Sequence, residues 1–186
     1  MRRSLATLTA SALAAAALLA GCNASVTAPG DDKAGADAKA SPGAPAATTE
    51  TAASARAFAE ALYARYSADG DFNPIVSRDG VWDPALLALM ARVDAAQEAS
   101  GDAIFDFEPL CQCQDNTGLI ARAGEARATG ADAATVPVEL SYPAGAAGRV
   151  ELKLVRVAGQ WRVHDIASKG VPSYAAHLAA AMAAGT

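Results

Sequence analysis

The sequence has few of the residues that build a large apolar core. Aromatic residues make up 5% of its 186 positions, and much of the 52% hydrophobic content is alanine, which buries little surface. A chain of this length fits one domain with a tail, and it is too short for a barrel enzyme or a two-domain dehydrogenase. We therefore expect one modest core in which small side chains let helices lie close to a sheet.

The sequence also lacks the short motifs of common enzymes. It contains no Gly-x-Ser-x-Gly, no His-Glu-x-x-His, no Gly-Lys phosphate loop and no dinucleotide fingerprint. It has only two histidines, and its net charge of −5 gives no basic surface for a nucleic acid. We predict a protein that is not an enzyme and that uses no cofactor and no metal.

The chain begins like a secretory signal. Residues 1–3 are a short basic start, and residues 5–20 form an uncharged apolar run that is too short for a comfortable membrane span. The run ends in Leu18-Leu19-Ala20-Gly21-Cys22, which resembles the lipobox of bacterial lipoproteins. The resemblance implies cleavage after residue 21, acylation of Cys22 and attachment to the membrane through lipid. An ordinary signal peptide with an incidental Cys22 is the alternative.

Position 23 is Asn rather than the Asp that resembles an inner-membrane retention signal, so we expect the outer membrane, on its periplasmic face. Residues 23–53 contain a single large aliphatic residue, Val26, and cannot bury enough apolar surface to offset chain entropy. We therefore predict a signal peptide over residues 1–21, an acylated cysteine with a disordered tether over residues 22–53, and a single domain over residues 54–186.

Hydrophobic periodicity predicts the elements of that domain. Ser54 and Asp83 are placed to cap helices, and apolar residues alternate with polar ones in the later strands. The expected helices are residues 54–67, 84–100 and 173–183, and the expected strands are residues 119–129, 134–142, 149–157 and 161–167. Helices followed by an antiparallel meander predict an α+β fold, with helices packed on one face of a curved sheet.

The last hairpin carries a family resemblance. Val155-Arg156-Val157-Ala158-Gly159-Gln160-Trp161-Arg162-Val163-His164-Asp165-Ile166 resembles the terminal hairpin of nuclear-transport-factor-2-like domains, an apolar strand and a Gly turn followed by Trp-x-Val-x-Asp-Ile. Together with the lipobox, Cys113-Gln114-Asp115 after an acidic loop is similar to the YbjP/YqhG-type periplasmic lipoproteins, a domain-of-unknown-function family. The resemblance implies a cone-shaped antiparallel sheet wrapped by helices, with a pocket inside, and no particular reaction.

Cys111 and Cys113 are the first candidates for chemistry. If Cys22 is acylated, they form an even pair in an oxidising compartment, so a disulfide is expected. A disulfide between residues two apart closes a small strained ring, which is more reducible than an ordinary one. Two free thiols, a soft-metal carrier site and a bond to another chain are the alternatives, although a metal would need further ligands such as His164 or His177.

Four acids surround these cysteines: Asp102, Asp106, Glu108 and Asp115. Such a cluster would suit a hard cation such as Ca²⁺, but the spacing lacks the EF-hand register. Capping of loops and helices is the simpler interpretation. Asp115 is the best candidate for a structural role, since it matches the Gln-Asp of the family resemblance.

Strand alternation places Asp165 on one face with Trp161 and Val163, and places His164 on the opposite, solvated face. If the first face lines a pocket, Trp161 is a pocket aromatic and Asp165 a buried acid that needs a partner. His177 on the closing helix is one candidate partner. A buried acid of this kind would act as a general base or would hold loop backbone in place.

These observations predict a non-catalytic binding or scaffold module that faces the periplasm. Its partner would be a periplasmic protein, for instance an enzyme that it inhibits in an immunity-type role. The alternatives are a small pocket enzyme that uses Asp165 as its base, and a metal carrier that uses Cys111 and Cys113.

Overall fold

The structure is a computed structural model that describes residues 44–68, 72–76, 78, 80–101, 103, 107–143, 145 and 147–184. The predicted signal peptide, Cys22, the tether as far as residue 43, Asp102 and Asp106 lie outside these residues. All the described residues belong to one compact unit. None of its helices is both long and apolar enough to span a membrane.

The first helix, α1 (Ala44–Ala68), begins ten residues before the predicted start. Ser54 does not cap it but lies inside it, where its hydroxyl donates a hydrogen bond to the Thr51 carbonyl oxygen (3.0 Å). The prediction that the tether extends to residue 53 is therefore wrong for residues 44–53. These residues are rich in alanine, the strongest helix former, and Thr51 is buried beside the Ala131 carbonyl.

The second helix, α2 (Pro84–Ser100), begins and ends as the sequence predicts. The Asp83 carboxylate accepts a hydrogen bond from the Leu86 N–H (2.7 Å), and Pro84 occupies the first turn. Gly101 ends the helix in a left-handed conformation, and its N–H donates to the Gln97 carbonyl. The third helix, α3 (Tyr174–Ala184), begins beside Ser173, whose hydroxyl oxygen accepts the Ala176 N–H.

Five strands form one antiparallel sheet in which β3 and β4 lie in the middle. Both β1 and β2 pair with β3, followed by β4 and then β5 at the other edge. The bounds are β1 (Ile120–Ala123), β2 (Arg127–Gly130), β3 (Ala133–Ser141), β4 (Ala147–Val157) and β5 (Gln160–Ser168). The weak strand expected over residues 119–129 is thus two short strands, and the other three lie where the alternation predicts.

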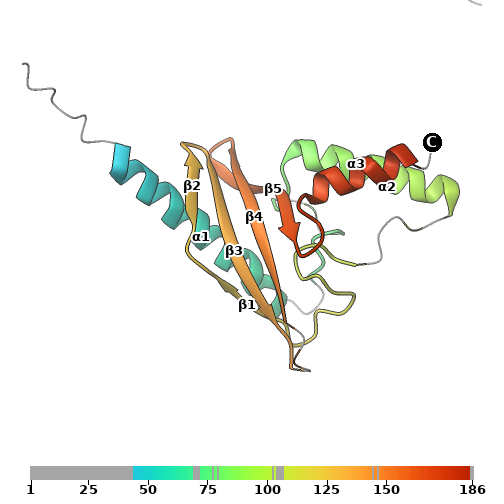
Figure 1. Cartoon of the computed structure of the whole chain (residues 1–186), viewed down its shortest axis with the longest axis horizontal. Coiled ribbons are helices and arrows are strands. Elements are labelled where there is room, and N and C mark those ends of the chain that lie inside the picture. Colours follow the sequence, from blue (N-terminus) through green and yellow to red (C-terminus); the bar gives the residue numbers. More distant parts are fainter. Residues whose placement is uncertain are drawn as a thin grey trace, which may run out of the picture. The chain divides into compact units, whose positions relative to one another are not determined.

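The helices form two groups on the sheet. As Figure 1 shows, α1 lies across β1, β2 and β3, whereas α2 and α3 pack against each other beside β5. Alternate residues of β3 and β4 form the centre of the core, each of them almost fully buried: Ala134, Val136, Val138, Leu140, Val150, Leu152 and Leu154. The predicted α+β class and the antiparallel sheet are confirmed.

An extra residue in β5 changes which face its later side chains occupy. Leu154 pairs with Val163, but the preceding Lys153 pairs with Asp165, so His164 is left over at a bulge. Paired residues share a face of the sheet, and consecutive residues of β4 point to opposite faces. Asp165 therefore lies on the face opposite Val163 and Trp161, and the prediction that the three share one face is wrong.

Candidate functional site

The loop between α2 and β1 brings the two candidate cysteines together. Cys111 and Cys113 are joined by a disulfide with only Gln112 between them. Cys111 is 1% exposed, while Cys113 is partly exposed. Gln112 has a φ of 55°, in the left-handed region that few residues with a Cβ atom adopt.

Glu108 is the centre of the hydrogen bonds that hold this loop. Its carboxylate accepts the Leu110 N–H (2.7 Å), the Cys111 N–H (2.9 Å) and the Tyr66 hydroxyl (2.5 Å). Its own N–H donates to the Cys113 carbonyl oxygen (2.8 Å), which closes a short bridge across the disulfide. Burial raises the pKa of Glu108, although the hydrogen bonds to its carboxylate act in the opposite direction.

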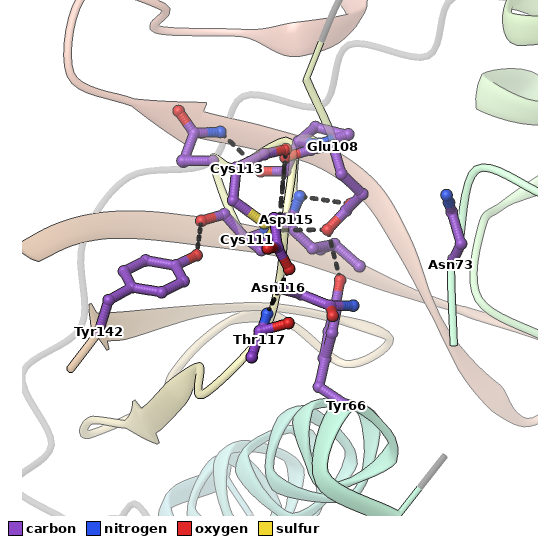
Figure 2. Close-up of a disulfide and its surroundings, with 12 residues drawn as sticks. Tyr66, Asn73, Glu108, Cys111, Cys113, Asp115, Asn116, Thr117 and Tyr142 are labelled. Carbon is purple, nitrogen blue, oxygen red and sulfur yellow. Dashed lines mark hydrogen bonds between the residues drawn. A yellow bond between two sulfur atoms is a disulfide. The ribbon is translucent and has the colours of Figure 1, made fainter. Parts of the chain in front are cut away.

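Two further tyrosines bind the loop from the helix and the sheet. The Tyr63 hydroxyl donates to the Leu110 carbonyl (2.8 Å), and the Tyr142 hydroxyl donates to the Cys111 carbonyl (2.7 Å). Figure 2 shows Tyr142 and Tyr66 reaching the loop from different elements. Burial and the nearby Glu108 carboxylate raise the pKa of Tyr63, Tyr66 and Tyr142, so all three hydroxyls stay protonated and donate.

A small cavity of about 240 Å³ opens beside the disulfide. Its polar lining includes the side chains of Asn73, Glu108, Asp115 and Asn116, as well as both cysteines. The exposed Asp115 carboxylate accepts the Thr117 N–H (2.8 Å), and the hydrogen bonds from Thr117 lower its pKa. Asp115 therefore forms a local turn at the end of the loop.

Asp165 lies outside this loop, on β5, and its carboxylate contacts the start of α3. One of its oxygens binds Lys153 Nζ (2.8 Å), and the other accepts the Ala175 N–H (3.0 Å). Burial acts to raise the pKa of Asp165, but hydrogen bonds from Lys153, Ala175 and Ser173 outweigh it, so the pKa lies below its ordinary value. The carboxylate fastens the first turn of α3 to β4 and β5. His177, the candidate partner of Asp165, lies two residues after Ala175 in α3, and its backbone N–H donates to the Ser173 carbonyl.

His164 is not simply a solvated residue, as the strand pattern predicted. Its ring Nδ1 pairs with the Asp83 carboxylate, although half of the side chain is exposed. The second Asp83 oxygen is the one that caps α2. The bulge in β5 thus gives His164 a contact with the start of α2 that regular alternation would not produce.

Trp161 lies between the sheet and α1. Its indole N–H donates to the Ser54 hydroxyl (3.2 Å), and the Arg156 guanidinium lies 4.7 Å from its ring centroid. The same guanidinium donates to Ser54 (2.8 Å). These contacts fasten the middle of α1 to the last hairpin, so the hairpin's aromatic residue serves the packing of the helix.

No group of three or more His, Cys, Asp or Glu residues is arranged to hold a metal ion within the described ranges. The disulfide also occupies both sulfurs that the metal-carrier alternative requires. Comparison with known proteins finds no matching family model, no matching curated protein and no matching solved structure.

Sequence reasoning found the cysteines and the acids but not the groups that bind them. Tyr63 and Tyr66 follow the apolar stripe of α1, which indicates packing and does not reveal a hydroxyl bound to a distant loop. The Asp83–His164 pair depends on the bulge in β5, and no residue type in that strand predicts the bulge. An aromatic hydroxyl on a buried face, which needs a partner, was the one available signal.

Proposed function

We propose that this chain is a lipoprotein held at the periplasmic face of the bacterial outer membrane, and that its α+β domain is a non-catalytic binding or scaffold module. The hydrogen bonds made by the buried acids are the main support for the absence of catalysis in this proposal. Asp83, Glu108 and Asp165 each accept at least one backbone N–H. A carboxylate held by such bonds is an anchor for a loop or a helix, and its oxygens are already occupied by donors of this chain.

An open groove supports the binding role. It has a volume of about 720 Å³ and lies where β4 and β5 meet the disulfide loop. Its lining residues are Gln112, Gly148, Arg149, Val150, Glu151, Ala167, Ser168 and Lys169. Two exposed cations, Arg149 and Lys169, line the groove against one exposed acid, Glu151, so the groove suits an acidic segment of a protein partner. The specific partner that we propose is a periplasmic enzyme that the domain inhibits.

We infer further that the sheet and its helices form the cone of a nuclear-transport-factor-2-like domain. The order of the elements and the terminal hairpin with Trp161 support this inference. The fold by itself assigns no reaction, because one architecture carries many functions.

The competing interpretation is a pocket enzyme with Asp165 as general base. A general base works best with a pKa near the working pH, whereas the contacts of Asp165 lower its pKa. The Lys153 partner and the α3 backbone also occupy the oxygens that a substrate proton would need to reach.

Asp165→Asn tests the proposal. The variant keeps the shape of the side chain but loses the charge that pairs with Lys153, so we expect unfolding to cost about 1–3 kcal/mol less than in the parent chain. Chemical denaturation measures this change, and Glu125→Gln, at an exposed position between β1 and β2, is the control. Unchanged stability together with lost binding of a small ligand would contradict the scaffold role and favour the pocket enzyme.

A further inference from the structure

The disulfide loop keeps many restraints that do not depend on the disulfide. Glu108 binds the N–H groups of Leu110 and Cys111, while tyrosine hydroxyls bind the carbonyls of the same two residues. The stabilisation that a disulfide gives grows with the length of chain it closes, and here the two cysteines are only two positions apart. Stabilisation of the fold therefore does not account for this cross-link.

The ring also contains an unfavourable backbone conformation. Gln112 and Ala158 are the non-glycine residues with positive φ in the described part of the chain. Ala158 lies in the tight turn between β4 and β5, where such a conformation is ordinary. Gln112 lies inside the disulfide ring, where its N–H also donates to the Glu108 carbonyl (2.9 Å) and its side-chain amide to the Pro109 carbonyl (2.6 Å). Opening the S–S bond removes the covalent part of this restraint. Release of this strain makes reduction to the dithiol more favourable than it would be for an unstrained disulfide.

The two sulfurs differ in their access to a reagent. Cys111 is almost fully buried and its backbone is held on both sides by Glu108 and Tyr142. Both cysteines border the 240 Å³ cavity, but Cys113 is the one that is partly exposed, and the cavity leaves room for an approaching dithiol. An incoming nucleophile therefore meets the Cys113 sulfur first, and Cys111 is the leaving group.

We propose that Cys111–Cys113 is a redox-active disulfide that oxidises a dithiol, with Cys113 as the attacked residue. One thiolate of the dithiol bonds to Cys113 Sγ, the S–S bond breaks, and Cys111 Sγ leaves with the electron pair and takes a proton. The second thiolate of the donor then displaces Cys113 Sγ, which takes another proton. The donor becomes a disulfide, and this chain gains two electrons and two protons as two thiols.

The first test measures the redox equilibrium of the native full chain carrying Cys22→Ser, so that only the pair reacts. The protein is equilibrated in buffers of set ratios of reduced to oxidised glutathione, and in parallel of reduced to oxidised dithiothreitol. Free thiols are trapped by alkylation and counted by intact mass. We expect half-reduction within the glutathione series, with circular dichroism unchanged. A pair that stays oxidised throughout both series and is reduced only in denaturant would overturn the proposal.

Gln112→Gly provides the sharper test. Glycine adopts the left-handed conformation without strain, so the oxidised form gains stability and the equilibrium constant for reduction should fall about tenfold. Ala158→Gly makes the same change at the other left-handed position, far from the sulfurs in sequence, and should keep the parent's constant. No shift in Gln112→Gly, or equal shifts in both variants, would contradict the proposal.

Discussion

Glu108 shows how one side chain organises the disulfide loop. Its carboxylate binds the Tyr66 hydroxyl on α1 and the Leu110 and Cys111 N–H groups within the loop. Its own N–H donates to the Cys113 carbonyl, on the other side of the disulfide. The same contacts place its carboxylate away from water, and this burial raises its pKa. Burial therefore favours the protonated form of Glu108 in the folded chain, while the hydrogen bonds to its oxygens favour the charged form.

Glu108 predicts a pH dependence of stability. Its pKa in the folded chain lies above its ordinary value of 4.5, so the folded chain binds more protons than the unfolded chain between those two values. The free energy of unfolding should therefore fall as the pH rises from 4.5 through the folded pKa. Denaturant titrations across this pH range measure the free energy of unfolding, and this pH-dependent fall should be absent in Glu108→Gln. A parent chain whose stability rises through the same range in step with the variant would contradict the assignment.

At the scale of elements, the later strands and α2 follow from the sequence, and α1 and the bulge do not. The alternation of Val150, Leu152 and Leu154 marks a strand with one buried face, and Asp83 with Pro84 marks the start of a helix. The start of α1 carries no apolar periodicity, since its first turns are mostly alanine and threonine. The bulge at His164 breaks an alternation that the sequence alone shows as regular.

The early start of α1 can be tested by amide hydrogen exchange on the full chain. Thr51 is 8% exposed, and its hydroxyl contacts the Ala131 carbonyl between β2 and β3. We expect the amides of residues 50–53 to exchange slowly, alongside those of the middle of α1. Exchange as fast as in an unstructured peptide would restore the tether to its predicted end at residue 53.

For the whole molecule, we propose a lipid anchor and a binding module, and each of the two can be tested without the other. The anchor rests on the lipobox around Cys22, which lies outside the described residues. The module rests on the groove and on acids that serve as structural partners. The pattern around Cys113 and the terminal hairpin contributes the family resemblance but no reaction.

Cys22→Ala tests the anchor by itself. The acyl chains would be lost, and an acidic domain has no charge with which to hold an anionic membrane surface. After cell fractionation, we expect the parent chain in the membrane fraction and the variant in other fractions. A variant that is still cleaved and still sediments with membranes would contradict the lipid anchor, whatever the domain does.

The most direct measurement is the pKa of Asp165, followed through its carboxyl carbon by NMR as the pH is lowered. The central claim is that this buried acid is a structural anchor for α3. The account predicts a titration midpoint below the ordinary value of 3.8, because Lys153, Ala175 and Ser173 stabilise the charged form. A midpoint near neutral pH, as in a carboxylate poised to take protons from a substrate, would contradict it.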